Sequence, residues 1–164
     1  MQAVMMTAAG GVDTLQLMEV PEPGITRPTQ VKVRVHAAGV NPVDTKLRSR
    51  GLFFEHALPA ILGCDGAGVI VETGTGVTAW QAGDRVWFCH GGLGREQGNY
   101  AQFTVIDANE VCRMPENFDF VQAAAAPLVL LTAWEALFRR AKLNPGQTVL
   151  VHAGAGGVGH IAIQ

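Results

Sequence analysis

Three glycines near the C-terminus have the spacing that dinucleotide-binding loops use. Gly154, Gly156 and Gly159 form a G-x-G-x-x-G pattern between the β-branched run 148–151 and an apolar segment, so the stretch predicts a strand, a tight turn and a helix. Such a loop lets a pyrophosphate approach the backbone and lie at a helix N-terminus, where unpaired N–H groups favour negative charge. An ordinary glycine-rich turn fits the spacing equally well. The flanking strand and helix favour the nucleotide-binding interpretation.

The position of this loop in the chain sets a further expectation. The sequence stops at Gln164, about one or two turns into the helix, so the charged residue expected roughly 20 residues after the glycines is absent. We therefore expect only the first βα unit of a truncated Rossmann domain. By itself the chain should show no measurable NADPH oxidation, because its nucleotide site is incomplete. Its C-terminal segment should be mobile or self-associated, because the run 148–151 has an open edge.

A second group of polar residues lies at a predicted helix N-terminus. Asn41 followed by Pro42 is typical of an N-cap and first helical position, which predicts a short helix over 41–49. Capping alone explains Asn41, but a helix that begins just after a strand can also present polar groups to a cleft. Asp44 could relay a proton, although an acidic residue near a helix N-terminus is also simply stabilising.

The elements that must position these residues change in type along the chain. Val31, Val33 and Val35 alternate with polar residues, which predicts a half-buried strand over 31–37, with His36 on its solvated face. Many short strands separated by glycine and proline predict a mainly β barrel or sandwich-like domain over residues 1–118. Further strands are expected at 2–6, 15–20, 69–72, 85–88, 100–106 and 110–113. Residues 119–164 should hold connecting helices over 120–126 and 128–141, followed by the glycine loop.

Composition narrows the class of protein. The chain has 164 residues, 48% of them hydrophobic, and a formal net charge of −2, which gives no electrostatic reason to expect nucleic acid or an anionic membrane as a partner. No run is long enough to span a membrane, and the N-terminus does not resemble a signal peptide. Cys64, Cys89 and Cys112 include no C-x-x-C pair, so reduced thiols in the cytoplasm are expected.

Several motifs follow one another along almost the whole chain. They are Asn41-Pro42-Val43-Asp44, Gly63-Cys64-Asp65-Gly66-Ala67-Gly68, Gly83-Asp84-Arg85-Val86, Gly98-Asn99-Tyr100-Ala101-Gln102-Phe103, Ala123 to Ala126, Leu131-Thr132-Ala133-Trp134 and the glycine loop. Their succession, in the right order, resembles the medium-chain dehydrogenase/reductase superfamily. The similarity is greatest to the N-terminal portion of its quinone oxidoreductase, zeta-crystallin-like branch. This resemblance implies a GroES-like catalytic domain joined to a Rossmann domain, with NADPH bound between them.

The resemblance also implies the residues of the site. Asn41 and Asp44 would be the catalytic residues, and Lys46 stands where the family commonly has a tyrosine. Glu135 and Arg139 share a helix face with Thr132, which is either a cleft face or an ordinary solvated one. The residues expected to bind the cofactor are Asn41, Pro42, Val43, Lys46, Thr132, Gly154, Gly156, Gly157 and Val158.

Zinc-dependent members of this superfamily bind their catalytic metal with a cysteine, the histidine of a Gly-His-Glu motif and a third ligand. At the corresponding places this chain has Asn41, the run 63–65 (Gly-Cys-Asp) and Leu128. One thiol beside one carboxylate does not supply the three or four converging ligands that zinc requires. Cys89 and His90 form a tempting pair, but neighbours along a strand point to opposite faces, so core or surface roles are favoured.

We therefore expect no metal and a zinc-independent transfer of hydride from NADPH, with NADH an open alternative, to a small-molecule quinone or conjugated enone. A cytoplasmic homodimer is expected, without nucleic-acid or membrane partners. Two alternatives remain open from the residues alone. One is a zinc-type alcohol dehydrogenase relative with displaced ligands, and the other is a non-catalytic GroES-like module for binding or oligomerisation.

Overall fold

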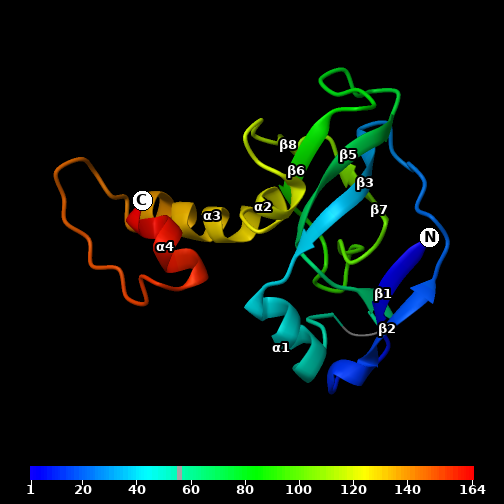
Figure 1. Cartoon of the computed structure of the whole chain (residues 1–164), viewed down its shortest axis with the longest axis horizontal. Helices are drawn as coiled ribbons and strands as arrows, with labels where there is room; N and C mark the ends of the chain where they lie inside the picture. Colours follow the sequence, from blue (N-terminus) through cyan, green and yellow to red (C-terminus); the bar gives the residue numbers. More distant parts are fainter. Residues whose placement is uncertain (55–56) are drawn as a thin grey trace.

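The computed structural model describes residues 1–54 and 57–164, and it consists of a β-rich part and a helical part (Figure 1). The β-rich part contains a three-stranded sheet in the order β2-β1-β4 and a five-stranded sheet in the order β7-β3-β5-β6-β8. All neighbouring strands are antiparallel. The strands are β1 (Gln2–Met6), β2 (Leu15–Glu19), β3 (Gln30–Gly39), β4 (Ala60–Ile61), β5 (Asp65–Thr73), β6 (Arg85–Cys89), β7 (Phe103–Asp107) and β8 (Cys112–Arg113).

The core of the larger sheet follows the alternation seen in the sequence. Val31 and Val33 of β3 are fully buried, and they pack with Ile70, Val86 and Ile106 from the neighbouring strands. Lys32 and Arg34, which alternate with these valines along β3, are less buried, as a period of two residues requires. The predicted half-buried strand is therefore confirmed.

The predicted GroES-like fold takes the form of two sheets, and no closed barrel of hydrogen-bonded strands forms within residues 1–54 and 57–164. The sheets are connected by the segment that precedes β7. Ala101 forms an isolated bridge to Ala3, and Val4 N–H donates to the Tyr100 carbonyl at 2.8 Å. On the other side, Val35 N–H donates to the Gln102 carbonyl at 2.9 Å. A few residues therefore contact both sheets without completing a ladder between them.

Small residues in β5 allow its backbone to approach its neighbours closely. A Cβ atom on Gly68 would lie 2.1 Å from the Arg34 carbonyl oxygen of β3, and one on Gly66 would lie 2.5 Å from the Phe88 ring of β6. Both distances are far below van der Waals contact, so side chains are excluded at these positions. Gly66 and Gly68 thus lack side chains because β5 lies between β3 and β6.

The helical part begins at α2 (Phe120–Ala124), which packs against β3 and β5. Pro127 interrupts the helix as expected and is the first residue of α3 (Pro127–Trp134). The single helix expected over 128–141 is wrong in one respect, because α3 passes into a π-helical segment, Glu135–Arg140, with a wider turn. None of the described helices is both long enough and apolar enough to cross a membrane.

The predicted strand over 148–151 is wrong. These residues are in no ladder, and Val149 and Leu150 have exposed fractions of 44% and 79%. Among residues 1–54 and 57–164 no strand pairs with this run, so its β-branched residues lack the cross-strand contacts that stabilise a strand. The helix after the glycines does form as α4 (Gly157–Ile163), and Figure 1 shows it lying beside α3 after the chain loops out and returns.

Candidate functional site

The centre of the candidate site is a buried carboxylate, Asp65, at the start of β5. Its side chain is 1% exposed. One oxygen, Oδ2, accepts a hydrogen bond from Asn41 Nδ2 at 2.9 Å, and the other, Oδ1, accepts one from the Leu128 backbone N–H at 2.9 Å. Burial raises the pKa of Asp65, while its hydrogen bonds to Asn41, Cys89 and Leu128 oppose that rise. The carboxylate is retained inside the protein because donors from three elements satisfy it.

Asn41 and Asp44 form the predicted start of α1 (Pro42–Arg50). Asn41 is the N-cap, Pro42 is the first helical residue, and a capping box joins Asn41 to Asp44, which confirms the expected helix. Asn41 N–H donates to Asp44 Oδ2 at 2.7 Å, and the Tyr100 hydroxyl donates to the same oxygen at 2.9 Å. Burial and the charge of Asp44 raise the pKa of Tyr100 well above its ordinary value, so Tyr100 is a hydrogen-bond donor at neutral pH.

Asp65 orients the Asn41 side-chain amide, whereas Asp44 binds only the Asn41 backbone N–H. When Asp65 is a carboxylate, both of its oxygens accept, and the Asn41 amide faces it with Nδ2, which carries two hydrogens. One hydrogen is given to Asp65, and no second acceptor for Nδ2 is found among the described residues. Asn41 and Asp65 line a hollow of about 250 Å³ whose other walls are small or apolar. Those walls are Ala37, Ala38, Gly39, Val40, Val121, Ala124 and Ala125.

The thiols near this carboxylate are protonated at neutral pH. Burial, followed by the charges of Asp44 and Asp65, raises the pKa of Cys64 to about 11. Burial and the charge of Asp65 raise the pKa of Cys89 to about 12. Because the thiolate is the nucleophile and the metal ligand, neither cysteine is prepared for such chemistry.

The positions that hold zinc ligands in related enzymes are therefore occupied by groups that bind one another. Asn41 donates to Asp65, Leu128 contributes only its backbone N–H, and Cys64 retains its proton. The donor set does not match zinc, which requires converging lone pairs. Over residues 1–54 and 57–164, no group of three or more His, Cys, Asp or Glu side chains is placed to hold a metal ion.

Cys89 and His90 also go to different partners. The Cys89 thiol is hydrogen-bonded to Asp65, whereas His90 Nε2 lies 3.3 Å from Glu96 and its Nδ1 contacts Glu110. The histidine thereby connects the loop after β6 to the turn before β8. Its role in this arrangement is to connect those two segments.

Helix α3 connects the buried carboxylate to the glycine loop. Leu128 N–H binds Asp65, and the Cγ1 atom of the next residue, Val129, lies 3.5 Å from where a Cβ of Gly157 would be. A Cβ on Gly159 would lie 2.2 Å from the Ala153 carbonyl oxygen, so the third glycine permits close packing of α4 on the preceding loop. Gly156 and Gly157 keep an exposed backbone, whereas Gly154 and Val158 are half-buried.

The other predicted site residues are distributed over different surfaces. Pro42 and Lys46 lie exposed on α1, and Val43 packs toward the core cluster that contains Leu47. Thr132 is exposed, and its hydroxyl donates to the Leu128 carbonyl at 2.7 Å.

Glu135, the second residue on the Thr132 face, pairs with Arg140 at 2.9 Å, and Arg139 is exposed. The solvated interpretation of this helix face is thus the one that the structure favours. Their predicted roles toward a cofactor remain predictions.

Sequence reasoning missed two members of the site, Asp65 as a hydrogen-bonding centre and Tyr100. A signal for Asp65 was present, because it is a lone charged residue inside the small-residue run 63–68. Small residues indicate close packing, and a carboxylate in such a place requires donors. Tyr100 gave no comparable local signal, since its partner Asp44 is distant in sequence.

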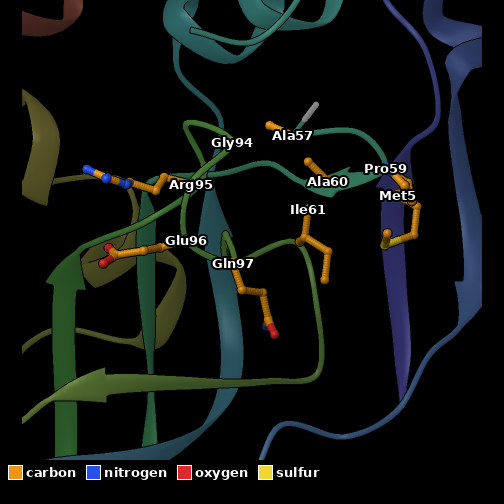
Figure 2. A pocket seen from close by; sticks show the side chains of 9 residues that line it. All are labelled: Met5, Ala57, Pro59, Ala60, Ile61, Gly94, Arg95, Glu96 and Gln97. Atoms are coloured by element: carbon orange, nitrogen blue, oxygen red, sulfur yellow. The ribbon is translucent and has the colours of Figure 1, made fainter. Parts of the chain in front are cut away.

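A second hollow, of about 240 Å³, lies between β4 and the loop after β6 (Figure 2). Figure 2 shows Arg95 and Glu96 extending away from Ala60 and Ile61, and both charged residues are exposed. The Gln97 amide is already engaged, because it donates to the Phe103 carbonyl at 2.7 Å. Among the described residues that line this hollow, the charged side chains are thus exposed and the Gln97 amide already has an acceptor.

Comparisons with known proteins relate the chain to proteins of known family. Residues 27–116 match the family described as the alcohol dehydrogenase GroES-like domain. The chain is 41% identical over 162 residues to a quinone oxidoreductase of Rattus norvegicus, covering 97% of this chain and 47% of that protein. It is 43% identical over 160 residues to the pikromycin polyketide synthase component PikAII of Streptomyces venezuelae, covering 97% of this chain and 4% of that protein.

Among solved structures, the Escherichia coli quinone oxidoreductase complexed with NADPH superposes with a TM-score of 0.82 at 35% identity. The match covers 99% of this chain and 48% of that one. The chain thus spans about half the length of the quinone oxidoreductases that it matches.

Proposed function

We propose that this chain, which belongs to the alcohol dehydrogenase GroES-like family, forms the N-terminal part of a zinc-independent oxidoreductase. The reaction is the transfer of a hydride from NADPH to a quinone or conjugated enone. The similarity to quinone oxidoreductases, one of them a complex with NADPH, supports both the reaction and the cofactor.

The observation that carries this proposal is the fixed amide of Asn41. A reduced nicotinamide, when bound, supplies the hydride. What remains for the protein is to orient the ring and to place a donor where negative charge develops on oxygen. Asn41 has one N–H left for that task in a hollow with small or apolar walls, and Asp65 and Asp44 hold its side chain and backbone.

The donor set supports a conjugated acceptor rather than an alcohol. Oxidising an alcohol is aided by a Lewis acid on its oxygen, and the groups at the metal-ligand positions are engaged with one another. An enone or quinone needs only a hydrogen-bond donor for the oxygen that gains charge, because conjugation spreads that charge. The residues present therefore match the second reaction.

The glycine loop supplies the other half of the proposed cofactor site. Gly156 and Gly157 offer exposed backbone, and Gly157 lies beside Val129 of α3. We assign the pyrophosphate to this loop, as the G-x-G-x-x-G spacing predicts. α3 would then lie between the donor at Asn41 and the phosphates.

The experiment is a rate measurement on the enzyme that contains this chain, with NADPH and an ortho-quinone or enone as substrates. Asn41→Ala should lower kcat by about 10²–10³-fold, because one positioned donor at the developing charge is lost. Asn109→Ala, at an exposed turn distant from the site, is the matched control and should leave kcat unchanged. Efficient oxidation of simple alcohols that a zinc chelator abolishes would refute the assignment.

The similarity to a polyketide synthase component favours a second candidate, in which the same hydride transfer is carried out by one segment of a much longer multidomain chain. The coding sequence on both sides of residues 1–164 distinguishes the two. A continuation of about the same length as this chain supports the separate enzyme, and several thousand flanking residues support the multidomain one.

A further inference from the structure

We propose that Asp65 is a positioning residue that holds the Asn41 amide and the start of α3 in one fixed relation. One carboxylate oxygen binds the amide and the other binds the helix. The contacts are independent of any reaction, and only their use in orienting a nicotinamide rests on the proposed function.

The start of α3 lacks a cap from its own segment. Its N-cap residue is Ala126, which has no side chain that could accept a hydrogen bond, and Pro127 has no N–H. The first free N–H of the helix is therefore that of Leu128, and Asp65 accepts it from a strand distant in sequence. A carboxylate at this end of a helix is also favoured by the helix dipole. Asp65 thus does for α3 what an N-cap residue does in other helices.

The same carboxylate fixes Asn41 with its Nδ2 toward residue 65, and a neutral residue of equal size could bind both partners only if the Asn41 amide reversed. Asn41 Nδ2 and Leu128 N–H are both donors, so both oxygens of residue 65 must accept. An asparagine would turn an NH₂ group toward one of these donors. The Cys89 thiol of β6 is a third group on Asp65, and its hydrogen bond opposes the rise in the pKa of this carboxyl that burial causes.

Helix α3 also connects Asp65 to the glycine loop. Asn41 is bound to Asp65, Asp65 to Leu128, and the adjacent Val129 lies against Gly157. The spacing between the proposed donor and the proposed pyrophosphate loop is thereby tied to a single carboxylate. Loss of that carboxylate should loosen both sides of the site.

The test compares the ¹⁵N-labelled chain with its Asp65→Asn variant by NMR. In the unaltered chain the Asn41 side-chain amide should be rigid, with an order parameter of about 0.85, and in the variant it should fall below about 0.6. Hydrogen exchange at Leu128 N–H should become about tenfold faster, as expected when a helix loses its cap. Asp65→Glu retains the charge and should recover part of both effects.

The matched control is Asp107→Asn in β7, which removes a carboxylate that binds Thr29 and the Asn109 N–H far from the site. It should leave the Asn41 order parameter and the Leu128 exchange rate unchanged. An Asn41 amide that stays equally rigid in Asp65→Asn would overturn the proposal. So would a flexible amide in the unaltered chain, a result that needs no folded variant.

Activity measurements on the enzyme that contains this chain distinguish the positioning role of Asp65 from the proposed function on which its catalytic use rests. Asp65→Asn should lower kcat about tenfold or more while the KM for NADPH changes less than about threefold, because orientation rather than affinity is lost. An enzyme that shows both NMR effects but does not oxidise NADPH refutes the proposed function and leaves the positioning of Asn41 intact. A normal kcat in Asp65→Asn refutes the catalytic use of that positioning.

Discussion

The β-rich part and the C-terminal part of this chain respond differently to the same kind of sequence signal. In β3, alternating valines find neighbours in β5 and β7 and become fully buried. In the run 148–151, β-branched residues of the same type remain outside any ladder, and Leu150 is exposed. A pattern of β-branched residues therefore indicates that a segment can form a strand, but the strand forms only where a neighbouring strand pairs with it.

Paired core and C-terminal substitutions should show the largest difference between the two parts. Ile70→Ala in β5 removes a fully buried side chain from the main core and should lower the free energy of unfolding by about 2–5 kcal/mol. Leu150→Ala removes an exposed one and should change it by less than about 0.5 kcal/mol. Urea unfolding of both variants measures this, and equal losses would show that the C-terminal part folds with the core.

Thiol reactivity should sharpen the contrast between interior and edge within the β-rich part itself. Cys112 lies exposed on the edge strand β8 and should react first with a disulfide reagent at pH 8. Because the pKa of Cys64 is raised to about 11 and that of Cys89 to about 12, these thiols stay protonated and should react at least about 100-fold more slowly. Their rates should increase as the pH is raised, since the thiolate fraction grows.

The control for this measurement is Cys112→Ser, which should abolish the fast phase and leave the slow one. A fast phase that persists in Cys112→Ser would mean that the Asp65 site opens to solvent.

Glycine substitutions should give a smaller but still clear difference. Gly68→Ala places a methyl group 2.1 Å from the Arg34 carbonyl oxygen and should cost about 1–3 kcal/mol, because two adjacent strands must move apart. Gly156→Ala, in the glycine loop, meets only the Ala153 carbonyl at 3.2 Å and should change stability by less than about 1 kcal/mol. Thermal unfolding of the two variants provides the comparison, and a larger loss at Gly156 would reverse it.

Nucleotide titration of the 164-residue chain should give the smallest signal. The run 148–151 forms no strand and α4 has only 7 residues, so the loop is poorly held, and NADPH should produce no detectable heat at micromolar concentration. Amide exchange at residues 145–164 should likewise be much faster than in β3 and β5. Saturable binding with strong protection of the glycine loop would remove the distinction between the two parts.

The fold and the site could be predicted from the sequence where the interacting groups lie close together in the chain, and not where they lie far apart. The valine alternation of β3 and the Asn41-Pro42 start of α1 are local signals, and both elements form where they were predicted. The hydrogen bond from Asn41 to Asp65 and the one from Tyr100 to Asp44 join residues that are distant in sequence. A pattern of spacing contains no information about such pairs, so Asn41 was identified as a site residue while the group that holds it was not.

The hydrogen bond that caps α3 joins positions 65 and 128, and these two positions should differ in the substitutions that they tolerate. Leu128 contributes its backbone N–H, so any residue except proline at 128 retains the hydrogen bond, whereas position 65 needs a side chain that accepts at both oxygens. A chimaera joined at residues 118 and 119 would therefore accept a foreign helix readily, provided that the β-rich part brings Asp65. Recombination between related proteins should succeed at this junction whenever the incoming helix has a residue other than proline at position 128.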